Sequence, residues 1–153
     1  MKNKLAIALA LGAVTITALA GPIEEQIRFR QSAYSFLGWN TAKIKAQAAD
    51  HPETFNKDQV IAAANAIAAV ANSGLNELYG EGTDKGTGWK PTRLKAEYFE
   101  KQAEVKEIDA TFIKEANELQ KVAASGDVAA IKTQFGKVGA TCKSCHDLIR
   151  VRE

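Results

Sequence analysis

Apolar side chains recur at intervals of three and four residues in four stretches of this chain, which is the period of helices that bury one face. The first stretch follows Pro22, a residue that suits a first helical turn, and stops where His51 precedes Pro52. The second follows Asn56, a residue type that caps helices. The predicted helices span about residues 22–49, 56–78, 91–123 and 128–149.

The segment from Tyr79 to Lys90 is the one long connection between these predicted helices, and it contains four glycines. It is too short to link two domains, and no stretch of the chain has the alternating pattern of a strand. We therefore expect an all-α protein with one domain, built as an antiparallel four-helix bundle.

The predicted fourth helix has an unbroken apolar series that includes both cysteines of the chain. Because the cysteines are in phase with the buried face, a group bonded to them must lie against the interior of the bundle. The members of the series are Val128, Ile131, Phe135, Val138, Cys142, Cys145 and Ile149.

The predicted first helix has a second apolar stripe formed by Phe29, Ala33 and Phe36. A surface helix usually needs only one apolar face. The additional stripe either widens the contact with the core or forms an interface with another subunit.

Residues 1–20 have the pattern of an export signal. Lys2 and Lys4 precede an apolar run that closes at Ala20 with the small residues A-L-A. An uncleaved membrane anchor would need a longer run. We expect residues 1–20 to be a cleaved signal peptide, residues 21–153 to be the four-helix-bundle domain, and the mature protein to be periplasmic.

Cleavage also changes the charge balance. The whole chain has 20 Lys and Arg against 18 Asp and Glu, and the signal removes Lys2 and Lys4, which leaves 18 against 18. This balance gives no indication of a nucleic-acid partner or of stable association with an acidic membrane.

Residues 142–146 read C-K-S-C-H, the C-x-x-C-H pattern of covalent haem attachment. Cys142 and Cys145 lie one helical turn apart, so each thiol can bond one haem vinyl group, while His146 can bind the iron. A thioredoxin-like pair would need a βαβ context. Structural zinc would need about four ligands, and His51 is the only other histidine. A simple disulfide would leave His146 unexplained, so haem c is the favoured cofactor.

The second axial position of the iron has few candidate ligands. Electron-carrying c cytochromes commonly use methionine, and the only methionine here is Met1. His51 lies at a predicted helix end, where side chains are usually exposed to water. We therefore expect a five-coordinate iron with His146 as its protein ligand and an open, apolar distal side.

These motifs resemble those of the cytochromes c′, and the resemblance extends over about residues 22–152. It rests on the signal peptide, the four-helix pattern, R-Q-S-A at 30–33, G-T at 82–83 and V-G-A-T-C-K-S-C-H at 138–146. The C-x-x-C-H string alone is common to many cytochromes, whereas its combination with R-Q-S-A and its C-terminal position are more specific.

The resemblance implies a high-spin haem, a ligand-free distal face and, frequently, a homodimer packed through the first two helices. It places Arg30 and Gln31 near the haem propionates. It also places Tyr34 on the distal side and Arg150 beside the proximal His146.

Each of these positions has a simpler interpretation. Arg30 could be an exposed arginine, Tyr34 a core residue, and Arg150 a favourable charge at a helix C-terminus. Thr92 could reach a propionate, but only its position indicates this. Trp39 and Trp89 are expected to be core or pocket-rim aromatics.

Three functions follow from this sequence. The favoured one is a haem protein that binds NO, CO or a similar diatomic, or exchanges single electrons with small redox proteins. An enzyme such as a peroxidase or NO reductase is less favoured, because peroxide cleavage usually needs a distal histidine. A six-coordinate electron carrier would require His51 or another group on the iron.

Overall fold

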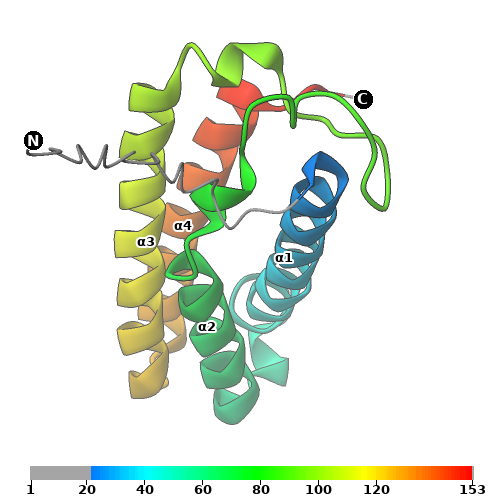
Figure 1. Ribbon diagram of the computed structural model, residues 1–153. Helices are drawn as coiled ribbons and strands as arrows, with labels where there is room; N and C mark the ends of the chain where they lie inside the picture. The colour runs from blue at the N-terminus through cyan, green and yellow to red at the C-terminus, as the bar shows by residue number, and fades with distance from the viewer. Residues whose placement is uncertain (1–21, 153) are drawn as a thin grey trace, which may run out of the picture.

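The structure, a computed structural model, describes residues 22–152. Its four long helices are α1 (Ile23–Ile44), α2 (Lys57–Ala71), α3 (Gln102–Ser125) and α4 (Val128–Ile149). Each runs antiparallel to the next (Figure 1). Residues 22–152 contain no β-strand, only two isolated bridges. The predicted all-α, antiparallel four-helix bundle is therefore confirmed, whereas the predicted signal peptide lies outside the described residues.

The predicted first helix keeps its helical conformation almost to its expected end, but its last turn widens. After α1, residues Lys45–Asp50 form a π-helical turn, η1, and residues Pro52–Thr54 form a short 3-10 turn, η2. It is η1, rather than the body of α1, that has the extensive contacts with α4. The N-terminal part of α1 and the C-terminal part of α4 are therefore not packed closely together.

The second helix begins as predicted but ends earlier. The side chain of Asn56 accepts a hydrogen bond from the backbone N–H of Gln59, which caps the start of α2. The helix stops at Ala71, and Gly74 adopts a left-handed φ of 77° that an α-helix cannot accommodate. Residues Leu75–Leu78 then form a separate 3-10 turn, η3, so the predicted continuation to residue 78 is wrong.

The third helix begins at Gln102, and the prediction that it begins at Pro91 is wrong. The backbone of residues 93–95 pairs instead with residues 149–151, at the C-terminal end of α4 and just beyond it. Lys95 donates its N–H to Ile149 O at 2.8 Å, and Val151 donates to Arg93 O at 2.9 Å. This pairing takes the backbone groups that a helix would need, and only a short 3-10 turn, η4 (Ala96–Tyr98), precedes α3.

The core has two parts. The larger cluster fills the centre of the bundle, and Cys142 packs against its edge. Cys145 packs against the smaller cluster, which consists of Leu94, Tyr98, Val105 and Ile149. The two cysteines of α4 thus lie at the junction between the two apolar clusters, as their phase in the sequence predicts.

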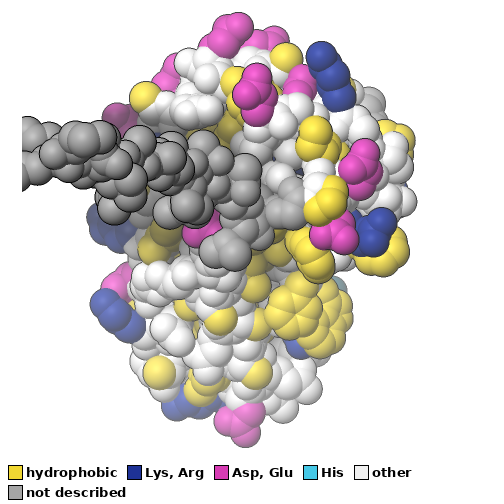
Figure 2. All heavy atoms as spheres, viewed as in Figure 1, with side chains coloured by type: hydrophobic (Ala, Val, Ile, Leu, Met, Phe, Trp, Pro, Cys, Tyr) yellow, Lys and Arg dark blue, Asp and Glu magenta, His cyan; other side chains and the backbone are white. Residues whose placement is uncertain are grey.

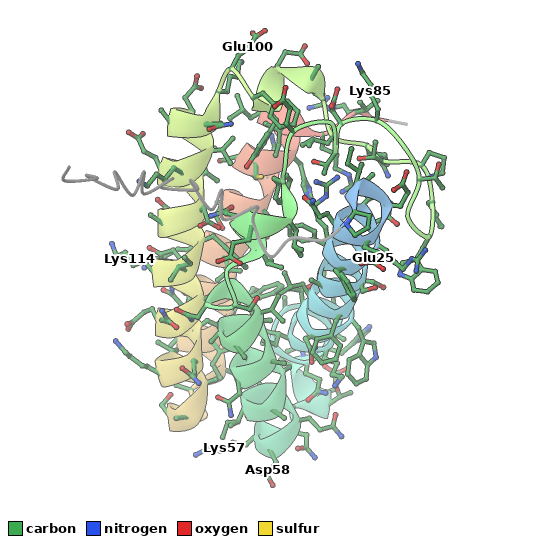
Figure 3. The ribbon with its side chains drawn as sticks, viewed as in Figure 1. Glu25, Lys57, Asp58, Lys85, Glu100 and Lys114 are labelled. Atoms are coloured by element: carbon green, nitrogen blue, oxygen red, sulfur yellow. The ribbon has the colours of Figure 1, made fainter. Side chains whose placement is uncertain are left out.

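The smaller cluster marks one end of the bundle. Lys85 and Glu100 lie at this end, and Lys57 and Asp58 lie at the opposite end (Figure 3). The C-terminal end of α4, the start of α1 and the glycine-rich connection meet there (Figure 1). No helix within residues 22–152 has the length and apolar character needed to cross a membrane.

Both tryptophans lie at the surface, so of the two expected placements, core or pocket rim, the core is wrong. Trp39 is 58% exposed and Trp89 is 68% exposed. Trp39 lies on the outer side of α1, where the Lys43 ammonium is 3.3 Å from its ring centroid. Trp89 donates its indole N–H to Ser32 Oγ of α1 at 2.8 Å.

Candidate haem site

Helix α4 presents Cys142 and Cys145 as free, partly buried thiols. Burial raises the pKa of both, that of Cys145 to about 11. Both thiols are therefore protonated at neutral pH, whereas the reactive thiols of thioredoxin-like pairs have lowered pKa values. Within residues 22–152, no cluster of three or more His, Cys, Asp and Glu side chains could hold a metal ion. The redox-pair and zinc interpretations thus find no support.

His146 lies on the exposed side of α4, one turn before Arg150, whose Nη1 is 3.4 Å from His146 Nε2. Partial burial and the guanidinium groups of Arg150 and Arg93 lower the pKa of His146. The imidazole is therefore neutral at pH 7, with a nitrogen lone pair available for a metal. The structure places Arg150 beside the histidine, as the sequence analysis expects.

His51 lies far from this arrangement. It is exposed, its Nδ1 is 3.3 Å from Glu53 Oε1, and it follows η1 at the end of the bundle opposite to the C-terminal end of α4 (Figure 1). The structure does not bring the two histidines of the chain together.

Arg30 is buried, with 6% of its surface exposed, so the interpretation as an exposed arginine is wrong. Its Nη1 donates to Leu78 O at 3.1 Å and Thr83 Oγ1 at 3.2 Å. Its Nη2 donates to Thr83 O and Thr92 Oγ1, both at 3.0 Å. All four acceptors are uncharged, and desolvation lowers the pKa of Arg30. A buried guanidinium without an anionic partner among residues 22–152 is unusual, because buried charges are normally paired.

Gln31 and Thr92 attach the glycine-rich connection to α1. Gln31 Oε1 accepts the backbone N–H of Trp89 at 2.7 Å and that of Lys90 at 3.2 Å, while its Nε2 donates to Lys90 O at 2.8 Å. Thr92 accepts from Arg30 and donates to Thr83 O at 3.0 Å. Arg30, Gln31 and Thr92 therefore gather at one place, although whether they contact haem propionates stays a prediction.

Tyr34 is 40% exposed, so it is not an ordinary core residue. Its hydroxyl accepts a hydrogen bond from the Tyr79 hydroxyl at 2.9 Å. Burial of the phenol raises the pKa of Tyr34 to about 12 and that of Tyr79 well above its usual value. The ring of Tyr79 stacks on Tyr98 with centroids 4.8 Å apart.

Tyr79 is the residue of this site that the sequence analysis missed. It follows η3 directly, in a stretch that the sequence pattern identifies only as a connection. The available signal was weak: an aromatic residue between an apolar helical stripe and a glycine-rich segment, a position where buried side chains often lie.

The tyrosines and His146 have different neighbours around Cys145. The Cys145 sulfur is close enough to raise the pKa of Tyr34, Tyr79 and Tyr98. The groups that shift the pKa of His146 are instead Arg150, Arg93 and Asp147. Tyr79 and Cys145 pack against the same small apolar cluster, whereas His146 lies on the exposed side of α4.

This donor set fits a haem. It offers two protonated thiols one turn apart, a neutral imidazole, a buried cation without an anion, and aromatic side chains beside the thiols. Together with the four-helix bundle, it defines a class of protein: a helical c-type haem protein with its cofactor between helices.

Comparisons with known proteins identify the family. The family model described as Cytochrome C′ matches residues 25–150. A cytochrome c′ of Rhodocyclus tenuis is 53% identical over 130 residues, covering 85% of this chain and 96% of that protein. A cytochrome c′ of Allochromatium vinosum is 50% identical over 145 residues, covering 95% of this chain and 92% of that protein.

Solved structures agree with this assignment. A cytochrome c′ with an unusual ligand-controlled dimer dissociation has a TM-score of 0.81 at 50% identity, covering 86% of this chain and 98% of that chain. Cytochrome c′ from Thermochromatium tepidum has a TM-score of 0.81 at 44% identity, covering 87% and 99%. The chain belongs to the cytochrome c′ family, and its cofactor is covalent haem c. The predicted family and cofactor are thus confirmed.

Proposed function

We propose that this protein is a periplasmic haem protein in which Cys142 and Cys145 form the thioether bonds and His146 is the single protein ligand of the iron. When bound, the haem supplies one-electron redox chemistry and a binding position for a neutral diatomic such as NO or CO. The chain positions the cofactor, neutralises a propionate through Arg30, and limits access to the distal side through Tyr34.

The observation that carries this proposal is that, among residues 22–152, no second strong iron ligand lies near the site. Tyr79 packs with Cys145 against the smaller apolar cluster and bonds to Tyr34, whereas His51 follows η1 at the other end of the bundle. After residue 20 the sequence contains no methionine. A five-coordinate, high-spin iron is the state that these side chains favour.

The same side chains favour binding and electron transfer over turnover of a substrate. Peroxide cleavage would need a distal group that takes up and returns a proton near neutral pH. Tyr34 and Tyr79 have raised pKa values and stay protonated there. They can donate a hydrogen bond but are poor bases, so the enzyme alternative ranks second.

A homodimer through the first two helices is part of this proposal. Phe29, Phe36 and Trp39 are exposed along α1, and Figure 2 shows hydrophobic side chains gathered at the surface beside this helix. Helix α2 exposes the small residues Ala62 and Ala69, which permit close approach of another helix. The solved relative with ligand-controlled dimer dissociation, 50% identical, supports a dimer, and the exposed side chains of α1 and α2 support this face as its interface.

Visible spectra of the exported protein test the proposed coordination. We expect high-spin ferric and ferrous spectra and a change to low spin when CO is added to the ferrous protein. The matched variant His51→Ala should have unchanged spectra. A low-spin ferrous spectrum without CO that becomes high-spin in His51→Ala would instead establish the six-coordinate alternative.

A further inference from the structure

Tyr79 contacts two residues that lie on the same face of α1. Arg30 and Tyr34 are four residues apart, so their side chains are neighbours on the helix. The Arg30 guanidinium carbon lies 4.4 Å from the centroid of the Tyr79 ring. The Tyr79 hydroxyl is 2.9 Å from the Tyr34 hydroxyl. One tyrosine from outside the helix thus contacts both residues.

Tyr79 itself is held at several points. Its ring stacks on the buried Tyr98, with an interplanar angle of 20°. Its backbone N–H donates to Asn76 O at 3.3 Å, and the preceding carbonyl, Leu78 O, accepts from Arg30. These contacts leave the Tyr79 hydroxyl at a defined position.

Tyr34 is held less firmly. It is partly exposed, and its hydroxyl bonds to Tyr79. The ring of Tyr79 cannot swing away without losing its contacts with Tyr98 and Arg30, whereas the hydroxyl of Tyr34 has one hydrogen bond, the one to Tyr79. Of the two tyrosines, Tyr34 is therefore the one free to move when a ligand enters.

We propose that Tyr79 is a positioning residue for the distal side: its hydroxyl holds Tyr34 across the ligand position, and ligand entry requires this hydrogen bond to break. The inference rests on the proposed open distal face. It adds a residue outside α1 that sets ligand affinity without contacting the iron.

The size of the effect follows from the strength of one neutral hydrogen bond. A typical bond of this kind corresponds to about a fivefold change in an equilibrium constant. Tyr79→Phe keeps the ring, and therefore the stacking on Tyr98 and the contact with Arg30, and removes only the hydroxyl. We expect this variant to bind CO in the ferrous state about five times more tightly than the wild type.

The test is a double-variant cycle on the intact haem protein with Tyr34→Phe, Tyr79→Phe and both together. CO affinity should rise about fivefold in each single variant and no further in the double variant, because both changes remove the same bond. Trp89→Phe is the matched control, since it removes one hydrogen bond between the same connection and α1, from the indole N–H to Ser32 Oγ, that involves neither Tyr34 nor Tyr79. Its CO affinity should stay within twofold of the wild type.

Urea unfolding of the CO-free protein provides a second readout, which does not depend on ligand binding. The unfolding equilibrium constant should rise about fivefold in each single variant and about as much in the double variant. Additive effects, or a CO affinity unchanged by Tyr79→Phe, would overturn the inference even if the iron is five-coordinate. If the two substitutions have non-additive effects on unfolding but the ferrous spectrum is low-spin, the proposed coordination would be overturned and the Tyr34–Tyr79 contact would stand.

Discussion

Replacing Arg30 with methionine should weaken the end of the bundle that contains the candidate haem site. Methionine has a similar length but no charge and no donors. The change removes four hydrogen bonds to the connection between α2 and α3, and also removes the guanidinium from the ring of Tyr79.

The structure limits how large the loss can be. Thr83 O keeps its bond from Thr92 Oγ1, and Thr83 Oγ1 still donates to Gly80 O at 2.8 Å. Leu78 O loses its charged donor, and an unsatisfied buried carbonyl costs about 1–3 kcal/mol. The lost cation–π contact adds about 1 kcal/mol. Removal of a buried charge offsets part of this, because its desolvation no longer opposes folding.

We therefore expect the free energy of unfolding to fall by about 3 kcal/mol, which lowers the melting temperature by roughly 9 °C in a domain of this size. Urea unfolding of the haem protein, followed by far-ultraviolet circular dichroism, measures the difference. Arg28→Met is the matched control: Arg28 lies on the same helix but is exposed, and its guanidinium only stacks 5.1 Å above the Trp89 ring. Equal losses in the two variants would refute the role assigned to the buried guanidinium.

Other features lead to further expectations. Burial raises the pKa of all three tyrosines, that of Tyr34 to about 12, so the folded state favours the protonated phenols. The stability that this contributes is complete below pH ~10 and is lost as the pH rises through about 12. Alkaline unfolding, followed together with tyrosinate absorbance, measures this loss. Gly88→Ala should lower the free energy of unfolding by about 1–3 kcal/mol, because the added Cβ would lie 2.7 Å from the Arg28 backbone N. Gly136→Ala, at a position within α4 where the added Cβ meets no atom within 4 Å, should raise it by about 0.5–1 kcal/mol in the same urea assay. Phe36→Glu should shift the protein from dimer to monomer in sedimentation velocity, with unchanged visible spectra; a persistent dimer would contradict an interface on this face of α1.

The amino-acid sequence alone was sufficient to predict the limits of those helices whose apolar pattern and caps lie within one stretch of chain. Helix α4 has the predicted limits because its apolar series and its Asp127 cap lie within a single stretch of chain; the Asp127 side chain accepts the N–H groups of Ala129 and Ala130. The same periodicity placed Cys142 and Cys145 toward the interior, where the structure has them. The cofactor followed from the C-x-x-C-H spacing.

The local sequence pattern did not predict the structure where segments far apart in the chain pair with each other. Leu94 and Tyr98 are buried as expected, but they precede α3, in a segment whose backbone bonds to residues 149–151 at the end of α4. A sequence pattern records that a side chain is apolar, not which distant backbone group will pair with it. The exposed Trp39 and Trp89 illustrate the same limit, since aromatic residues occur both in cores and on surfaces.

The sequence by itself thus determined the fold class, the haem-binding string and the phase of both cysteines, because each depends on residues near one another along the chain. Only the tertiary structure decided that Arg30 is buried among neutral acceptors and that Tyr79 reaches Tyr34. These contacts join residues 45 or more positions apart. They exist because the connection after α2 folds back over α1, a consequence of packing between elements that no local pattern records.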